Sequence, residues 1–178
     1  MPSHGAISDA FSLRLKRKMA KWSPPPFPSF KLQFDGASKG NPGKFGIGVI
    51  IFDHSSKIIK AIGKYIGYGT NNMVEFQALS FGLDLAHSLN IKDIVIEGDS
   101  MLVCQAVAAK KCFSWHLQYL LEHILLQLNG FSTFSISHSF REINVFADFL
   151  ANNVVTEGAD CIELAPSDFP ISCMKILS

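Results

Sequence analysis

The stretch of sequence that decides the fold is Lys31-Leu-Gln-Phe-Asp35-Gly-Ala-Ser-Lys-Gly-Asn-Pro-Gly43. Its first five residues alternate in character, as a strand with two different faces does, and the pattern breaks at Gly36. The segment from Gly40 to Gly43 is typical of a tight turn, in which glycine lets the backbone approach a ligand closely. We therefore expect a strand that ends at Asp35 and a turn after it.

The rest of the chain alternates between strand-like and helix-like patterns. Residues 46–52 and 57–66 are β-rich runs around a polar turn, which predicts a meander of three antiparallel strands. We expect helices over residues 72–89, 101–108, 115–128 and 144–157, and strands over 94–96 and 131–137. The first helix follows from apolar residues at three- and four-residue steps. This order of elements predicts an α/β fold with a mixed sheet flanked by helices.

The composition favours an ordinary globular protein. Of the 178 residues, 48% are hydrophobic and 17% are charged, and these are globular values. No apolar run approaches the roughly 18–20 residues of a membrane-spanning helix, and the first thirty residues lack the pattern of a secretory signal. The four cysteines show no metal-binding pairing and suit a reducing compartment: Cys104, Cys112, Cys161 and Cys173. We expect a soluble intracellular protein, nuclear or cytoplasmic, with no membrane partner.

Charge divides the chain into three parts. Residues 1–30 carry five Lys or Arg against one acid, a net charge of +4. Residues 31–157 carry ten against eleven, a net charge of −1, and residues 158–178 carry one against three, a net charge of −2. A neutral central part is unusual for a nucleic-acid binder, but four acids committed to metals would leave its other side chains at about +3. Charge therefore neither supports nor excludes nucleic acid as the ligand.

The two ends of the chain differ from the centre. Residues 1–30 are predicted to form a basic, proline-rich flexible arm: residues 13–22 fit a short helix, and the prolines keep residues 23–29 extended. The basic run is either a nuclear address or nucleic-acid tether, or a solvated extension without a role. Residues 158–178 are acidic and aperiodic, and we expect a loose tail.

Four carboxylates occupy positions that suggest a function. Asp35 ends the first strand, Glu75 lies in the first turn of a helix, Asp99 follows the fourth strand, and Asp148 lies inside the last helix. Burying acids together is costly because like charges repel, and Mg²⁺ removes that cost as a hard cation that binds carboxylate oxygens. Each acid alone also has a structural explanation. Asp35 fits turn chemistry and Glu75 fits an interaction with a helix dipole. Asp99 fits a helix cap, and Asp148 fits a solvated helix face.

Taken with their flanking residues, the acids resemble those of the ribonuclease H type 1 family, most closely its plant-type, retroelement-derived subset. The motifs are Asp35-Gly-Ala-Ser-Lys-Gly-Asn-Pro-Gly43, Thr70-Asn-Asn-Met-Val-Glu75, Glu97-Gly-Asp-Ser100, and His138 with Asp148-Phe-Leu-Ala-Asn152. They follow the family order, and the resemblance covers residues 31–157. It implies an RNase H-like fold whose five-stranded mixed sheet has the order 3-2-1-4-5, with the acids on one side.

The resemblance also implies an activity, which is cleavage of the RNA strand of an RNA–DNA hybrid to 5′-phosphate and 3′-hydroxyl products. Asp35 would bridge two Mg²⁺ ions, with Mn²⁺ as a possible substitute. Asp148 would complete the site of the ion that activates water, and Glu75 and Asp99 would hold the ion at the leaving group. His138 would transfer a proton or ease product release, and a loop histidine without a role is the alternative.

Substrate contacts follow from the same resemblance, which assigns them to six residues: Gly36, Ser38, Asn41, Asn71, Asn72 and Met101. Short polar groups suit the reading of RNA 2′-hydroxyls along a minor groove. Helix capping is an additional explanation for Asn71 and Asn72.

The sequence departs from the family pattern in two places. Asp99 and His138 are 39 positions apart, too close for the long basic insertion of bacterial members, and only Lys110 and Lys111 remain there as a basic pair. Because phosphate contacts supply much of nucleic-acid affinity, we expect this domain alone to bind nucleic acid weakly and with strong salt dependence. We also expect a monomer, with a protein partner as a source of further affinity. Phe146 and Phe149 flank Asp148 and either pack against the tail or crowd the site.

Three functions are open at this point. The first is an endonuclease on RNA–DNA hybrids. The second is a catalytically weak or inactive retroelement-derived module that binds nucleic acid, against which the intact acids and His138 argue. The third is an inactive interaction scaffold, which the apolar residues expected to be exposed near Phe140 and Phe146 would support.

Overall fold

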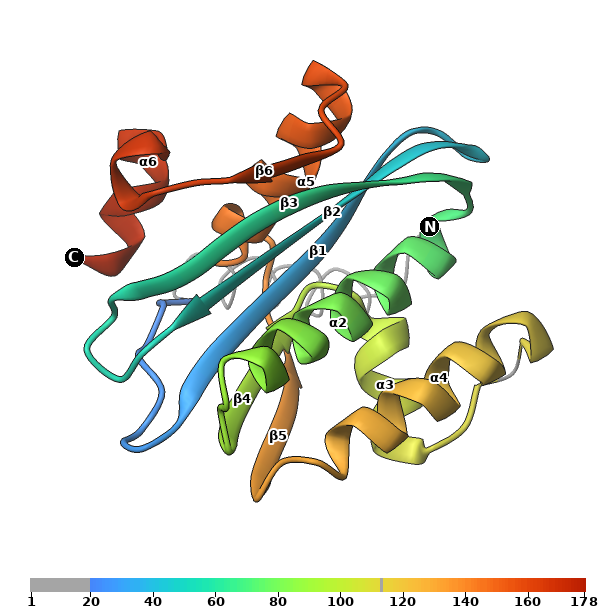
Figure 1. The fold of residues 1–178 in the computed structure, drawn as a ribbon, viewed down its shortest axis with the longest axis horizontal. Coiled ribbons are helices and arrows are strands. Elements are labelled where there is room, and N and C mark those ends of the chain that lie inside the picture. The colour runs from blue at the N-terminus through green and yellow to red at the C-terminus, as the bar shows by residue number, and fades with distance from the viewer. Residues whose placement is uncertain (1–19, 113) are drawn as a thin grey trace, which may run out of the picture.

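The computed structural model describes residues 20–112 and 114–178 and contains a mixed six-stranded sheet (Figure 1). The strands are β1 (Phe30–Gly40), β2 (Gly43–Phe52), β3 (Ile58–Gly69), β4 (Asp93–Gly98), β5 (Thr133–His138) and β6 (Cys161–Glu163). Their order is β5-β4-β1-β2-β3-β6. Strand β4 runs parallel to β1 and β5, and the other neighbours are antiparallel. The predicted order of the first five strands is confirmed, and β6 extends the sheet beyond the prediction.

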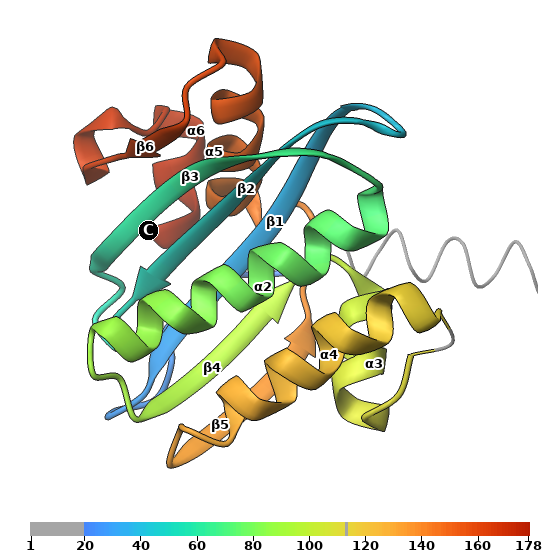
Figure 2. The same cartoon turned by 45° about the vertical axis from the view of Figure 1, so that its right-hand side comes forward.

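Helices cover both faces of the sheet. They are α2 (Asn71–Ser88), α3 (Met101–Ala109), α4 (Trp115–Leu128), α5 (Val145–Glu157) and the short α6 (Ile171–Met174), with 3₁₀ turns η1 (Pro166–Asp168) and η2 (Lys175–Leu177). Helices α2, α3 and α4 lie on one side, and α5 and the C-terminal segment lie on the other (Figures 1 and 2). Among the described residues, no helix combines the length and apolar character needed to cross a membrane.

The side chains of β2 divide between two hydrophobic clusters. Ile47, Val49 and Ile51 belong to the cluster shared with α2, α3 and α4. Ile50 and Phe52 belong to the cluster shared with α5 and the C-terminal segment. A strand buried on both faces is a nearly continuous apolar run, which is what the sequence shows between residues 45 and 52.

Strand β1 does not end at Asp35, so that prediction is wrong. The strand continues through Gly36 to Gly40 because β2 pairs with it along its whole length, from Lys31 opposite Phe52 to Gly40 opposite Gly43. Asp35 therefore lies inside a strand, opposite Gly48, and turn chemistry does not explain it.

Glycines in β2 and β3 let α5 lie close to the sheet. A Cβ atom would come within 2.1 Å of the Ala147 carbonyl oxygen at Gly48, and within 2.8 Å of the Leu150 carbonyl oxygen at Gly63. Both distances are shorter than real Cβ contacts, so only glycine fits without a shift of the helix backbone. This close approach sets how near Asp148, the residue after Ala147, comes to β1.

Residues 158–178 are not the loose tail that the sequence suggests. Strand β6 pairs with β3, and Phe169 is buried with its ring centroid 5.1 Å from that of Phe146 and 5.7 Å from that of Phe149. Phe146 and Phe149 thus pack against this segment instead of crowding the acids. Phe146 is fully buried, so the expectation of exposed apolar surface there is also wrong. The segment was missed because its elements are too short to show a periodic pattern.

Part of the predicted flexible arm belongs to the folded domain. Among residues 20–29, Pro25 is buried, the Trp22 ring meets the Phe52 ring edge-on at 5.1 Å, and the Ser29 N–H donates to the Pro26 carbonyl. The predicted basic helix over residues 13–22 lies mostly outside the described residues.

Phe169→Ala tests whether the C-terminal segment stabilises the domain. Loss of a buried aromatic side chain typically costs 3–5 kcal/mol, so the free energy of unfolding should fall by about 3 kcal/mol. Ile171→Ala, in the same segment but at a side chain 76% exposed, should change it by less than about 0.5 kcal/mol. Chemical denaturation measures both variants, and equal effects would contradict the packed arrangement.

Candidate active site

Asp35 on β1, Glu75 on α2 and Asp99 directly after β4 converge at one place. One carboxylate oxygen of each lies within 4.8 Å of the other two. Strands β1 and β4 are parallel neighbours, which brings Asp99 beside the second half of β1. Helix α2 approaches because Gly36 has no side chain: a Cβ atom there would lie 2.6 Å from Val74 Cγ1.

Helix capping does not account for these residues. The cap of α3 is Ser100, whose Oγ accepts a hydrogen bond from the Val103 N–H at 3.4 Å, so Asp99 is free of that role. The cap position of α2 is Thr70, which rules out the capping explanation for Asn71 and Asn72. We expected Glu75 in the first turn of α2, but the helix begins at Asn71 and Glu75 lies beyond that turn.

Burial and mutual repulsion raise the pKa values of all three acids. Burial, followed by repulsion from Glu75, Asp99 and Asp148, raises the pKa of Asp35 to about 10, although the Gly36 N–H donates to its carboxylate at 2.9 Å. Burial and then repulsion from Asp99 raise the pKa of Glu75 to about 8. Burial also raises the pKa of Asp99. Without a cation, the cluster therefore retains protons at neutral pH.

The cluster fits a divalent cation. Its carboxylate oxygens are the hard donors that Mg²⁺ and Mn²⁺ prefer. Glu75 Oε2 is buried and has no hydrogen-bond partner among the described residues, so it is available as a ligand. A cation would replace the protons and remove the repulsion that raises the pKa values.

Asp148 lies beside the three-acid group and not within it. With Glu75 it lines a polar cavity of about 360 Å³, and its charge raises the pKa of Asp35. Its Oδ1 accepts hydrogen bonds from Arg141 Nη2 at 2.9 Å and from Asn152 Nδ2 at 3.1 Å. The predicted fourth ligand is thus close to the cluster, but Arg141 holds its carboxylate.

Two residues at this site carried no signal in the sequence. Arg141 is an exposed side chain before α5, and the hydrogen bond to Asp148 raises its pKa. Asn144 is fully buried, and its Nδ2 donates to the Phe34 carbonyl at 2.9 Å, which ties the start of α5 to β1 next to Asp35. An asparagine at the start of a predicted helix suggests only a cap, and an arginine seven positions before an aspartate has no distinctive pattern.

His138 is the last residue of β5 and is half-buried. Its Nε2 lies 3.2 Å from the Asp99 carbonyl oxygen, so the imidazole contacts the backbone that carries one of the acids. It lines a different cavity, of about 240 Å³, with Lys31 and Glu97. Its role in proton transfer stays a prediction.

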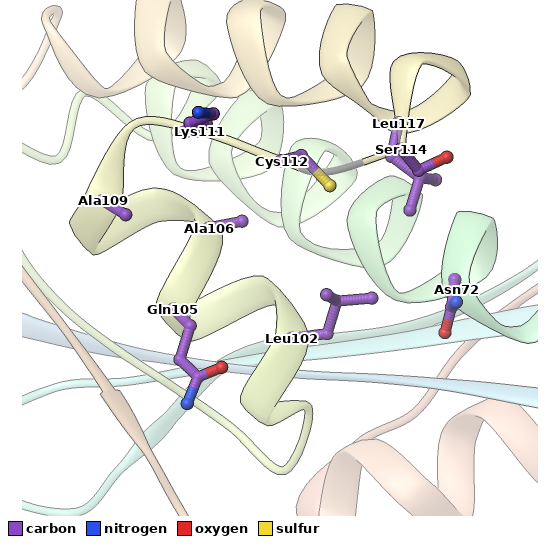
Figure 3. Close-up of a pocket in the computed structure, with 9 residues that line it drawn as sticks. All are labelled: Asn72, Leu102, Gln105, Ala106, Ala109, Lys111, Cys112, Ser114 and Leu117. Carbon is purple, nitrogen blue, oxygen red and sulfur yellow. The ribbon is translucent and has the colours of Figure 1, made fainter.

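The predicted substrate contacts fall into two places. Beside the acids, Ser38 Oγ donates to Asn71 Oδ1 at 2.8 Å, and the Asn71 N–H lies 3.4 Å from Asn41 Oδ1. These polar groups lie near Gly36, which lines the same cavity as Glu75 and Asp148. Exposed Asn72 instead lines an apolar cavity of about 240 Å³, which lies between the starts of α2 and α4 and helix α3 (Figure 3). Met101 is the first residue of α3 and is 48% exposed.

Known proteins show the same fold and sequence pattern. A family described as reverse transcriptase-like matches residues 33–154. Ribonuclease HI of Halobacterium salinarum is 36% identical over 125 residues, which are 70% of this chain and 63% of that protein. The crystal structure of RNase H1 from this archaeon has a TM-score of 0.70 and 33% identity, over 74% of this chain and 99% of that chain. LC11-RNase H1, crystallised in complex with an RNA/DNA hybrid, has a TM-score of 0.68 and 27% identity, over 72% of this chain and 98% of that chain.

The sheet order and the acid cluster define a domain of the ribonuclease H class. More particularly, the chain belongs to the reverse transcriptase-like family and is homologous to ribonuclease HI. It spans 63% of the length of the curated archaeal relative.

The raised pKa values predict a specific pH dependence of stability. Because Asp35 and Glu75 have pKa values of about 10 and about 8 when folded and about 4 when unfolded, the folded state binds more protons at neutral pH. The unfolding temperature in EDTA should therefore fall as pH rises from about 5 to about 8. Mg²⁺ should raise it more at pH 8 than at pH 6, and Asp35→Asn should flatten the EDTA profile. A profile in EDTA that rises over this range would contradict the cluster.

Arg141→Gln tests whether the arginine competes with cations. Removal of its charge frees the Asp148 carboxylate, so Mg²⁺ should bind roughly two- to fivefold more tightly, the small effect typical of an exposed ion pair. Titration calorimetry measures this, with Lys92→Gln as the control for loss of one positive charge elsewhere. Weaker Mg²⁺ binding by the Arg141 variant alone would show that the arginine orders the site instead.

Proposed function

We propose that this chain is an endoribonuclease that cleaves the RNA strand of RNA–DNA hybrids with the help of two divalent cations. The observation that carries the proposal is the convergence of Asp35, Glu75 and Asp99, with Asp148 beside them, in a ribonuclease H-type domain. Support for the substrate class comes from LC11-RNase H1, whose complex contains an RNA/DNA hybrid.

Each of the four acids would bind one or both of the cations. Asp35 is the most deeply buried and has the others around it, so its carboxylate would help to hold both ions. Glu75 and Asp99 would complete one site, and Asp148 the other. When bound, Mg²⁺ or Mn²⁺ would make a hydroxide available near neutral pH and would stabilise the departing 3′ oxygen. The products would carry a 5′-phosphate and a 3′-hydroxyl.

Arg141 and His138 would act on either side of the acids. For Asp148 to bind a cation through Oδ1, that oxygen must leave the arginine. The guanidinium is then available to a phosphate of the bound strand, an acceptor that matches its planar donors. His138, next to the Asp99 backbone, would hold or release a proton as the product leaves.

Recognition of the hybrid would depend on shape and sugar contacts. The linked polar side chains of Ser38, Asn41 and Asn71 suit hydrogen bonds to 2′-hydroxyls and sugar oxygens in a minor groove. Such contacts carry no base code, so cleavage should tolerate many sequences.

Asp99→Asn tests the proposed activity. The unmodified protein with Mg²⁺ at low salt should cut only the RNA of a labelled RNA–DNA hybrid, and leave RNA duplex, DNA duplex and single strands intact. The variant should cut at least about 100-fold more slowly. Loss of a residue that only hydrogen-bonds to a metal ligand already lowers metal affinity or activity by about 10–100-fold. No cutting by folded unmodified protein with Mg²⁺ or Mn²⁺ would favour a module that binds nucleic acid without cleaving it.

A further inference from the structure

One face of strand β1 carries three buried polar side chains in a row. Side chains alternate along a strand, so Lys31, Gln33 and Asp35 lie on the same face. Their exposed fractions are 2%, 0% and 3%. Asp35 belongs to the acid cluster, and Lys31 forms an ion pair with Glu97 on the neighbouring strand β4. Gln33 lies between these two charged groups.

Stability does not account for a glutamine at this position. Ile50, the residue opposite Gln33 on β2, is fully buried in the hydrophobic cluster around α5, so an apolar side chain in place of Gln33 would extend that cluster. Gln33 Oε1 is buried without a hydrogen-bond partner among the described residues, and such burial costs free energy. Its Nε2 makes two long hydrogen bonds, at 3.4 Å to Glu97 Oε2 and 3.3 Å to the Ile143 carbonyl oxygen. A buried polar group with so little gain needs another explanation.

The Ile143 carbonyl belongs to the turn that carries Arg141. This turn joins β5 to α5, and the N–H groups of Ile143 and Asn144 close it by donating to the Phe140 carbonyl at 2.9 and 3.2 Å. Two side-chain amides hold its end to β1. One is Gln33, at the Ile143 carbonyl, and the other is Asn144, whose Nδ2 donates to a β1 carbonyl at 2.9 Å.

The position of the turn decides where the Arg141 guanidinium lies. The Arg141 side chain is 72% exposed, so little packing holds it and it follows its backbone. Its Nη2 donates to Asp148 Oδ1 at 2.9 Å. Asp148 is carried by α5, whose close packing against Gly48 does not involve the turn. A shift of the turn therefore moves the arginine away from a carboxylate that stays in place.

We propose that Gln33 is a positioning residue for Arg141. Its amide holds the Ile143 carbonyl and thereby sets the reach of the guanidinium toward Asp148 and toward a phosphate of the bound strand. Glu97 accepts from the same amide nitrogen, which keeps the amide from rotating away from the turn. This inference rests on the proposed function and adds a residue outside the acid cluster.

Cleavage by paired variants tests whether Gln33 acts through Arg141. Gln33→Met keeps the size of the side chain and removes both donors. It should lower kcat/KM for a labelled RNA–DNA hybrid about tenfold, since small misplacements at a site cost up to about 100-fold. In the Arg141→Gln background the same change should matter less than about twofold, because residues that act through one another are not additive. Equal losses in both backgrounds, or no loss in either, would overturn the proposal.

Magnesium binding gives a readout that needs no cleavage. If Gln33→Met lets Arg141 leave Asp148, titration calorimetry should show Mg²⁺ bound about two- to fivefold more tightly, as expected for Arg141→Gln. The two changes together should bind Mg²⁺ no more tightly than Arg141→Gln alone. Unchanged Mg²⁺ affinity in the Gln33→Met protein would contradict the proposed route through the arginine.

Gln127 offers a matched control on the other face of the sheet. It is 9% exposed, and its Nε2 also donates to one backbone carbonyl, that of Ser80 at 3.0 Å, and to one carboxylate, Asp84 Oδ1 at 2.7 Å. Gln127→Met should lower the unfolding temperature by several degrees, because these hydrogen bonds are short. It should change kcat/KM and Mg²⁺ affinity by less than about twofold. The same loss of cleavage in both methionine variants would make the role of Gln33 merely structural.

The fold of the tested variant is checked by thermal unfolding. Gln33→Met should shift the unfolding temperature by less than about 4 °C, because the hydrogen bonds lost are long and an unpaired oxygen is removed with them. If this variant does not fold, Gln33→Asn replaces it in both assays. Asparagine keeps the amide but is shorter by one C–C bond of about 1.5 Å, too short to hold the Ile143 carbonyl.

The two assays separate this inference from the proposed function. If the unmodified protein cuts hybrids and Gln33→Met matches it in cleavage and Mg²⁺ binding, Gln33 has no positioning role and the proposed function stands. If the unmodified protein does not cut hybrids, the proposed function fails, and the Mg²⁺ titrations still decide whether Gln33 holds Arg141 at Asp148.

Discussion

Three carboxylates confined within 4.8 Å resist simultaneous ionisation, and the other structural elements hold them together despite this repulsion. The parallel pairing of β1 and β4 sets Asp99 beside Asp35. Gly36 admits α2 and with it Glu75, and the Asn144 amide ties α5 to β1. Because each contact comes from a different element, the cluster exists only in the completed fold, and the cations proposed to bind there would relieve its main source of instability.

The sequence allowed much of this arrangement to be predicted, for identifiable reasons. The long strands and helices each bury an apolar face, so their order and the five-strand sheet followed from periodicity and family motifs. The convergence of Asp35 and Asp99 was implied by the family resemblance, and the pairing of β1 with β4 produces it. The end of β1 was misplaced because Gly36 and Ala37 have weak strand preferences, and pairing with β2 overrides them. Strand β6 is three residues long and leaves no pattern to detect.

Side-chain partners were the least predictable part of the site. The sequence identified Asp148, but the partners of its carboxylate, Arg141 and Asn152, depend on how the turn before α5 is folded. The sequence left two alternatives open for Phe146 and Phe149. Both rings contact the buried Phe169, so they pack against the C-terminal segment. Similarly, the sequence predicted that residues 20–29 belong to a detached arm, but Trp22 contacts Lys31 and Phe52 of the domain.

The packed C-terminal segment has a consequence for how the domain is isolated. The family match ends at residue 154, whereas the hydrophobic cluster around α5 continues to Leu177. A fragment cut at the family boundary would uncover the rings of Phe146 and Phe149 and the outer edge of β3. Exposed strand edges next to apolar surface are the usual starting points for self-association. Such a fragment would keep every proposed metal ligand and still aggregate, and its inactivity would say nothing about the chemistry of the acids.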